Sequence, residues 1–260
     1  MRLISFDTLR TLDIPGVVNV KPADWLRRKD EIIAADVVLF PEYWQVNALI
    51  YAWKMSIFPS INSYHLGHDK IEMTRAFEAL CPEHVPFTRI LPSTPAALEQ
   101  VLDEFSFPFV AKVVRSSMGQ GVTLIESRAA LHEYAQANDV LYIQERLPIH
   151  RDVRVVVIGG KAVTAYWREA QDGRFHNNVA QGGAVSFEQI PDGAIHLAER
   201  VATQLGVDHA GFDIAEVDGH FYLFEFNVRF GTDALNARGL RLGPLIVEYL
   251  ESVKTSSHRG

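Results

Sequence analysis

The 260-residue chain has a single cysteine and no long apolar run. Because Cys81 has no partner, an intrachain disulfide is excluded and a reducing cytosol is the expected compartment. A membrane-spanning helix needs roughly 18 or more consecutive apolar residues, and no segment here reaches that length. The N-terminus, MRLISFDTLR, lacks the apolar core of a signal peptide. We therefore expect a cytoplasmic protein without a membrane partner.

An excess of positive charge is also absent. The formal net charge is -7, which argues against a nucleic-acid partner because phosphate binding usually shows as a basic patch. The sequence has no Gly-x-Ser-x-Gly elbow, no Walker lysine loop and no G-x-G-x-x-G after a predicted strand. His65 and His68 form an H-x-x-H pair, but no second cluster with metal-ligand spacing accompanies them. The motifs of serine hydrolases, P-loop enzymes and zinc sites are thus missing.

What is present predicts an α/β protein of one or two domains. Hydrophobic residues make up 48% of the chain and charged residues 22%, which are ordinary globular values. Residues 1–66 are expected to form a small β/α unit of parallel-sheet type, with strands at 1–7 and 36–40 and helices at 22–35 and 47–57.

The remaining chain is expected to form two lobes, residues 67–141 and 142–260. Thr94 is a predicted helix cap, with Pro95 in the first helical position. The predicted helices are 66–80, 94–105, 128–136, 192–205 and 243–254, and the first of them is expected to begin near Asp69 with Lys70 in its first turn. The predicted strands are 108–114, 121–125, 141–145, 152–158 and 161–167.

Three oxygen-bearing side chains occur in a predicted hairpin near the C-terminal end. Asp213 stands on its first strand, while Glu225 and Asn227 are two residues apart on the second and share one face. Hard divalent cations prefer carboxylate and amide oxygens. The pattern therefore predicts a site for Mg²⁺ or Mn²⁺, with a hairpin that has one solvated face as the alternative.

The turn of this hairpin tests the metal prediction. Asp218-Gly219 favours a tight two-residue turn. A regular ladder from such a turn would place Asp213 opposite Phe224. Facing Glu225 instead requires a three-residue or bulged turn.

Lys112 lies within an apolar predicted strand, where a lysine is costly unless its head reaches water or an anion. The loop that follows contains Ser-Ser-Met-Gly-Gln-Gly, whose backbone N–H groups and hydroxyls can bind phosphate oxygens. We interpret Lys112 and this loop as a phosphate contact. The alternative is an edge-strand lysine that discourages aggregation.

Further polar groups follow along the chain. The strand end at 144–147 could offer backbone groups to an adenine edge, or be a strand end and nothing more. Asp152 and Arg154 share a strand face, and with Arg168 and Asn178 they would place charge near a phosphate or carboxylate. Each of these residues alone also fits a solvated surface charge.

The order of these features resembles the ATP-grasp superfamily, and most of all its RimK type, ligases that add glutamate to a protein C-terminus. The resemblance runs from about residue 61 to residue 251 and is clearest in PFVAKVVRSSMGQGV, YIQERL, GRFHNNVAQGGA and the pair AGFDI and LFEFN. It implies an ATP-grasp fold, in which two lobes sandwich ATP, after a short N-terminal β/α unit.

The resemblance also implies roles on the nucleotide side. Lys70 and Lys112 match two lysines that contact ATP phosphates, and Gln120 with Gly121 matches the mobile loop that covers them. The other residues expected to bind the nucleotide are Gln144, Glu145, Arg146, Leu147 and Asp152.

On the catalytic side, the three predicted metal ligands match residues that hold Mg²⁺ against the phosphates. Arg154, Arg168 and Asn178 are similar to residues near the γ-phosphate and the acceptor carboxylate. The chain departs from the RimK type on the substrate side. Val-Arg-Phe-Gly follows the Glu-x-Asn motif where small residues, serine and proline are usual, and Gln181 stands in place of an arginine. Arg229 is therefore a candidate to bind a substrate carboxylate.

The implied reaction is ATP-dependent ligation of a carboxylate and an amine through an acyl phosphate, with release of ADP and phosphate. The expected substrates are an amino acid or peptide, or a protein C-terminus. Two alternatives stay open: an ATP-grasp phosphotransferase, because a scaffold does not dictate its reaction, and a non-catalytic nucleotide-binding regulator. The full metal set argues against the last. Oligomeric state is open, with a homodimer the commonest closed assembly.

Overall fold

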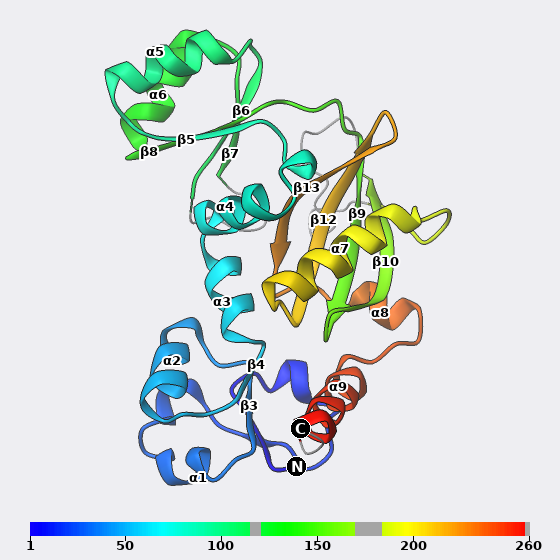
Figure 1. Ribbon diagram of the computed structural model, residues 1–260. Helices are drawn as coiled ribbons and strands as arrows, with labels where there is room; N and C mark the ends of the chain where they lie inside the picture. Colours follow the sequence, from blue (N-terminus) through cyan, green and yellow to red (C-terminus); the bar gives the residue numbers. More distant parts are fainter. Residues whose placement is uncertain (115–120, 170–183, 258–260) are drawn as a thin grey trace.

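Three β-sheets form the frame of the protein (Figure 1). The computed structural model describes residues 1–114, 121–169 and 184–257. The strand orders of the sheets are β2-β1-β3-β4, β5-β8-β6-β7 and β11-β10-β9-β12-β13. Within the described residues, no helix is both long and apolar enough to cross a lipid bilayer.

The N-terminal sheet is parallel, which confirms the parallel β/α pattern. Its strands are β1 (Leu3–Ser5), β2 (Val18–Asn19), β3 (Val37–Leu39) and β4 (Ile57–Phe58). Its helical segments are η1 (Leu9–Thr11), η2 (Pro22–Asp24), α1 (Lys29–Ile33), α2 (Tyr43–Asn47) and η3 (Ala48–Ala52). The sequence did not predict β2 and β4, because two residues are too few to show a strand period.

Two helix predictions in this unit are wrong in extent. The predicted helix at 22–35 is only a 3₁₀ turn followed by the five-residue α1. Leu26 and Ile33 are exposed, so the apolar residues do not continue one buried stripe. The helix predicted at 47–57 begins earlier, at Tyr43. It starts there because the backbone N–H of Glu42 donates to Gln45 Oε1 at 2.8 Å, as part of a capping box.

The second sheet is antiparallel and is covered by two helices. Its strands are β5 (Thr88–Pro92), β6 (Phe109–Lys112), β7 (Val122–Ile125) and β8 (Val140–Gln144). The helices are α5 (Pro95–Glu104) and α6 (Arg128–Ala137). Thr94 accepts a hydrogen bond from the Ala97 N–H, which confirms the predicted cap. Leu98, Phe109 and Leu131 lie in the core between the layers.

The third sheet is the largest. Its strands are β9 (Arg151–Ile158), β10 (Lys161–Glu169), β11 (Ala184–Ser186), β12 (His209–Val217) and β13 (His220–Asn227). Helix α7 (Asp192–Leu205) covers one face and ends at Gly206, whose φ of +66° is the left-handed conformation that glycine adopts readily. Val153, Val155 and Val157 of β9 point into this layer, so their neighbours on β9 face the other way.

Two successive helices join the sheets. The helix expected to begin near Asp69 is α4 (Lys70–Leu80), and α3 (Ile61–His68) precedes it. Asp69 caps α4 by accepting from the Ile71 N–H at 2.8 Å, which places Lys70 in its first turn. Met73 of α4 packs in the core of the large sheet, while Thr74 Oγ1 lies 2.7 Å from the Tyr142 hydroxyl of β8. Helix α4 thereby ties the second sheet to the third.

The last helix returns to the N-terminal unit, whereas the helix before it lies against the large sheet (Figure 1). Helix α8 (Asp233–Ala237) follows β13, and α9 (Leu242–Ser257) closes the chain. Leu242 and Ile246 of α9 share a buried cluster with Leu39 of the N-terminal sheet and Ile158 of β9. The N-terminal unit is therefore held against the large sheet by packing as well as by chain connection.

The hairpin of β12 and β13 has the register that the metal prediction requires. Asp218 and Gly219 form a two-residue turn with positive φ at both positions, and Val217 pairs with His220. The ladder then shifts by one residue, with Phe224 as the extra residue, so that Asp213 pairs with Glu225. The predicted irregularity exists, although it lies in the ladder rather than in the turn.

Candidate active site

Charged side chains of β9, β10, β12 and β13 lie together on the face of the large sheet opposite α7, next to an apolar cluster in which α8 packs against Val156 and Tyr166. The cross-strand register places Asp213 of β12 opposite Arg154 of β9 on one side and Glu225 of β13 on the other. On the next strand along, Arg168 of β10 is opposite Asp152. Four neighbouring strands thus contribute to one polar row across this face, in which the Asp152–Arg168 pair is offset by two residues from the line of Arg154, Asp213 and Glu225.

Two arginines and two aspartates form a buried network within this row. Arg154 donates to both carboxylate oxygens of Asp213, with Nη2 3.0 Å from Oδ2. Arg168 Nη2 lies 3.0 Å from the same oxygen. Arg168 also donates from Nε and Nη2 to Asp152 at 2.7 and 2.8 Å. All four residues are buried, and the bidentate geometry fixes the plane of Arg168.

The network holds its charges in place. Burial would raise the pKa of Asp213, but the guanidiniums of Arg154 and Arg168 outweigh it and hold that pKa below the ordinary value. Burial lowers and the two carboxylates raise the pKa of Arg168, and the carboxylates prevail. For Asp152, burial dominates and raises the pKa to about 6 against the pull of Arg168. Asp213 and Arg168 are accordingly a lasting anion and cation at neutral pH.

Two lysines meet the β13 side of this row. Lys70 Nζ of α4 lies 3.8 Å from Glu225 Oε2. Lys112 ends β6, and its Nζ lies 5.5 Å from the centre of the Tyr142 ring and 5.7 Å from that of Phe224. Lysines from the helix and from the second sheet therefore converge on the predicted metal strand, across from the arginines.

The predicted metal ligands supply hard oxygen donors. Asp213 and Glu225 are cross-strand partners, and Asn227 Nδ2 donates to Glu225 Oε1 at 3.1 Å. Two carboxylates and one amide oxygen are the donor set that Mg²⁺ or Mn²⁺ accepts, with remaining positions left to phosphate and water. Among the described residues, no group of three or more His, Cys, Asp or Glu side chains is placed to hold a metal ion, so the predicted site depends on the Asn227 amide as well.

The predicted adenine segment lies at the end of β8, beside β6. Gln144 is buried and its amide donates to Thr88 Oγ1 at 2.9 Å. Glu145 is tied to Phe87 twice, through its own N–H at 2.9 Å and through Oε1 at 2.6 Å. Its side chain therefore fixes the strand end. Arg146 is exposed and Leu147 half-buried.

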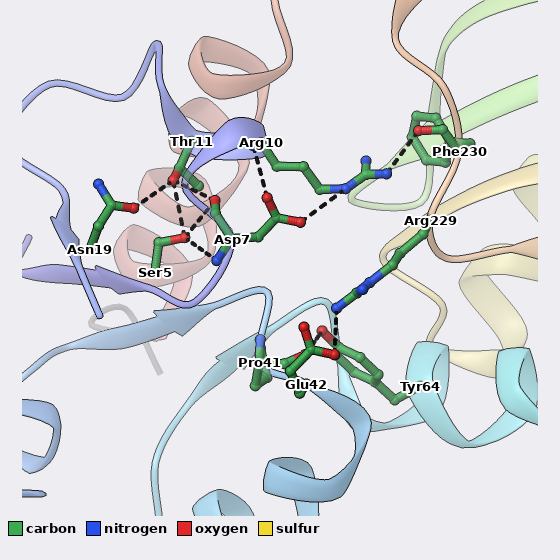
Figure 2. Close-up of polar contacts among 10 residues, drawn as sticks. All are labelled: Ser5, Asp7, Arg10, Thr11, Asn19, Pro41, Glu42, Tyr64, Arg229 and Phe230. Atoms are coloured by element: carbon green, nitrogen blue, oxygen red, sulfur yellow. Dashed lines mark hydrogen bonds and ion pairs between the residues drawn. The ribbon is translucent and has the colours of Figure 1, made fainter. Parts of the chain in front are cut away.

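The remaining predicted residues are dispersed. Gln120, Asn178 and Gln181 lie outside the described residues. Gly121 is described, with a φ of +78°, and its carbonyl accepts from the Val113 N–H at 2.6 Å. Arg229 is not part of the arginine network. Its Nη2 lies 3.1 Å from Glu42 Oε2, in the N-terminal unit (Figure 2).

Sequence reasoning missed two features of the site. The bond of Asp152 to Arg168 depends on the register of β9 and β10, which no local motif encodes. Arg10 was missed entirely, although its Nη2 donates to the carbonyl of Phe230 at 3.0 Å, 220 residues away in sequence. Its position directly after the first strand was the one available signal, because ligands favour the carboxyl ends of parallel strands.

The Lys112 ammonium gives the first prediction. Burial, only partly opposed by Glu225, lowers its pKa from 10.5 to about 8. A phosphate contact needs the charged form, so above pH 8 we expect the Kd for Mg-ATP to rise about tenfold per pH unit. Titration calorimetry from pH 7 to pH 10 measures this dependence.

Lys112→Met should bind Mg-ATP weakly and without this pH dependence, while the exposed control Lys161→Met should follow the wild type. A pH-independent wild-type Kd would contradict the contact.

The buried Lys112 ammonium also affects the stability of the fold in a defined direction. Since the folded pKa is the lower one, unfolded chains bind more protons between pH 8 and 10.5, and the penalty of burying Lys112 fades as the pH rises through that window.

A small antiparallel sheet and a larger one, with lysines on one side and paired carboxylates on the other, define the ATP-grasp class of ATP-dependent ligases. The RimK-like ATP-grasp domain matches residues 78–250. The chain belongs to this family.

Known proteins agree with this assignment. A probable alpha-L-glutamate ligase of Haemophilus ducreyi is 30% identical over 215 residues, which cover 78% of this chain and 68% of that protein. The ribosomal protein bS6–L-glutamate ligase of Escherichia coli is 28% identical over 158 residues, 58% of this chain and 53% of the relative. D-alanine–D-alanine ligase of Bacillus anthracis, solved with ATP, matches the fold with a TM-score of 0.74 at 14% identity over 100% of both chains.

These findings confirm the predicted α/β ATP-grasp fold, the RimK-type resemblance and the ligase class. The protein is an ATP-dependent carboxylate–amine ligase.

Proposed function

We propose that the protein activates a carboxylate as an acyl phosphate and passes the acyl group to an amine. The observation that carries this is the meeting of two lysines with the carboxylate row: Lys70 Nζ lies 3.8 Å from Glu225, beside the arginine-bound Asp213. Opposed cations and metal-binding oxygens are what a transferring phosphoryl group requires, since catalysis of this step is mainly positioning and charge neutralisation.

Each group has a proposed task. Lys70 and Lys112 hold the phosphates of ATP, and the segment after β8 receives the adenine. Glu225, Asn227 and Asp213 hold Mg²⁺, which when bound neutralises charge on the phosphates and aligns them. Binding of the ion requires Asp213 to share its oxygens between the ion and the arginines. Asp152 acts as a positioning residue, because its two hydrogen bonds set the plane of Arg168.

The arginines Arg154 and Arg168 then face the acid substrate. Their guanidiniums stabilise the charge that grows as a carboxylate oxygen attacks the γ-phosphorus and the bond to ADP breaks. An amine next attacks the acyl carbon, loses a proton and displaces phosphate.

The relatives suggest the substrates. The Haemophilus ducreyi and Escherichia coli relatives are both named as glutamate ligases, and the name of the second states that it acts on ribosomal protein bS6. We propose glutamate as the amine, and a peptide or protein C-terminus as the acid. The proposed units are residues 1–66, 67–141 and 142–260, with the nucleotide between the last two. A cytoplasmic location fits the need for ATP.

Hydroxylamine trapping tests this function. Purified protein is incubated with Mg-ATP, hydroxylamine and a panel of amino acids and dipeptides, and ADP, AMP and hydroxamate are measured. Substrate-dependent ADP with hydroxamate is expected. AMP would indicate an adenylating enzyme and contradict the mechanism, and ADP without hydroxamate would favour the phosphotransferase.

A further inference from the structure

The N-terminal sheet has a switch point that faces the end of the metal strand. Its parallel order β2-β1-β3-β4 changes direction between β1 and β3. In open sheets of this kind, ligands bind outside the carboxyl ends of the strands at such a point. The chain leaving β1 carries Asp7 and Arg10, and the chain leaving β3 carries Glu42. Figure 2 shows these side chains meeting Arg229 and Phe230, which follow β13.

Two arginines come together here from opposite sides. Arg10 reaches out of the N-terminal unit to the carbonyl of Phe230, with its Nε 3.5 Å from Asp7 Oδ2. Arg229 reaches back to Glu42. Burial lowers the pKa of Arg10, and the positive charge of Arg229 lowers it further. The negative charge of Asp7 raises this pKa but does not outweigh burial. The mutual repulsion of two guanidiniums is a cost that a bound anion would relieve.

The Arg10 guanidinium lies 5.8 Å from the centre of the Phe40 ring and 6.0 Å from that of Phe230, but its hydrogen-bonding capacity is not fully used. Among the described residues, the buried Nη1 of Arg10 has no hydrogen-bond partner, and its side chain is only 18% exposed. A buried charged donor without an acceptor is expensive, which makes this group unusual for a purely structural link. The side chain of Arg229 is 46% exposed, so an anion can reach it from solvent.

We propose that Arg10 and Arg229 bind a substrate carboxylate that is not the one phosphorylated, and that Glu42 pairs with Arg229 until this carboxylate displaces it. The inference rests on the proposed ligase function. Arg229 is two residues beyond Asn227, so their Cα atoms are at most roughly 7 Å apart, a separation that a small dicarboxylic amino acid can span. The planar guanidinium fork suits a carboxylate.

The carboxylate could belong to the incoming amino acid or be a second acid group of the activated substrate. Four probes distinguish these sources: L-glutamate, L-glutamine, isoglutamine and glutarate, each titrated calorimetrically into the full chain with Mg-ADP. Glutamine lacks the side-chain carboxylate, isoglutamine lacks the main-chain one, and glutarate lacks the amine. Arginine-dependent binding of glutarate assigns the site to the acid substrate. Binding of glutamate without glutarate assigns it to the amine substrate.

Variants of the arginines test the site itself. Arg229→Met should raise the Kd of the bound probe about tenfold to a hundredfold, the loss expected for a charge-assisted pair. The wild type should prefer L-glutamate to whichever of L-glutamine and isoglutamine lacks the carboxylate that the arginines bind, and Arg229→Met should abolish this preference. Arg10→Lys, which keeps a charge but loses the fork, should raise the Kd less. The exposed Arg27→Met is the matched control and should leave the Kd unchanged.

Glu42→Gln has the opposite expected sign. The amide keeps an oxygen to accept at the start of α2 but removes the charge that competes for Arg229, so the Kd should fall. A purely structural role for the Glu42–Arg229 pair does not produce tighter binding. Unchanged Kd values in Arg229→Met and Glu42→Gln, or no binding of any probe by the wild type, overturn the inference. ADP formation in the hydroxylamine assay is independent of this result, so failure of the site and failure of the ligase mechanism are separately visible.

Discussion

Glu225→Gln is expected to lower kcat by about a thousandfold or more, because an amide is a poor substitute for a carboxylate that holds Mg²⁺ against the phosphates. The residue pairs with Asp213 across the strands, is bonded by Asn227 and lies beside Lys70. The measurement is substrate-dependent ADP release under saturating Mg-ATP.

A second readout separates the metal from the chemistry. Mn²⁺ is titrated into protein and ADP in the absence of Mg²⁺, and its binding is monitored by electron paramagnetic resonance. Glu225→Gln should bind Mn²⁺ more weakly than the wild type. Glu216→Gln, an exposed carboxylate on the same hairpin, is the control and should keep wild-type binding and turnover. Full activity of Glu225→Gln would refute the metal assignment.

Arg168→Met is expected to abolish turnover and to cost about 3–5 kcal/mol of unfolding free energy, because it leaves the buried Asp152 without its hydrogen-bonded cation and Asp213 with Arg154 alone. Arg168 is the cation shared by Asp152 and Asp213. Urea denaturation at neutral pH measures the loss. The control is Arg151→Met on the neighbouring cross-strand pair, which is 53% exposed and should cost about 1 kcal/mol or less.

The pH dependence of Arg168→Met has a defined direction. Without the Arg168 guanidinium, burial raises the folded-state pKa of Asp152 still further above its unfolded value, and the pKa of Asp213 rises because only Arg154 is left to oppose burial. The destabilisation should therefore be small below about pH 4 and grow as the pH rises through those folded pKa values. An equal loss at acid and neutral pH would show that packing, rather than charge, is what Arg168 contributes.

The sequence predicted the irregular register of the β12–β13 hairpin well because its information is local. Period-two alternation, a turn dipeptide and three oxygen side chains were enough to require an irregular register between Asp213 and Glu225. The position of the bulge was not predictable. Phe224 is the extra residue, and its ring lies 5.7 Å from Lys112 Nζ, which comes from another sheet. Contacts of that kind depend on how the sheets pack.

The substrate side was harder to predict for the same reason. The contacts of Arg229 with Glu42 and of Arg10 with Phe230 join segments from opposite ends of the chain. Short elements also escaped prediction, such as β5, which ends in a proline and has no clear alternation. The roles of the individual site residues remain predictions that the variants above test.

The transfer of one oxygen atom from the carboxylate of the acid substrate to the released phosphate tests the central mechanism most directly. An acid identified by hydroxamate formation is labelled with oxygen-18 in its carboxylate and incubated with protein, Mg-ATP and the amine, and the phosphate is examined by phosphorus NMR. Attack on the γ-phosphorus followed by cleavage of the acyl carbon–oxygen bond predicts one labelled oxygen in each phosphate formed with ADP. Unlabelled phosphate, with product formed at the same rate, would contradict an acyl-phosphate ligase.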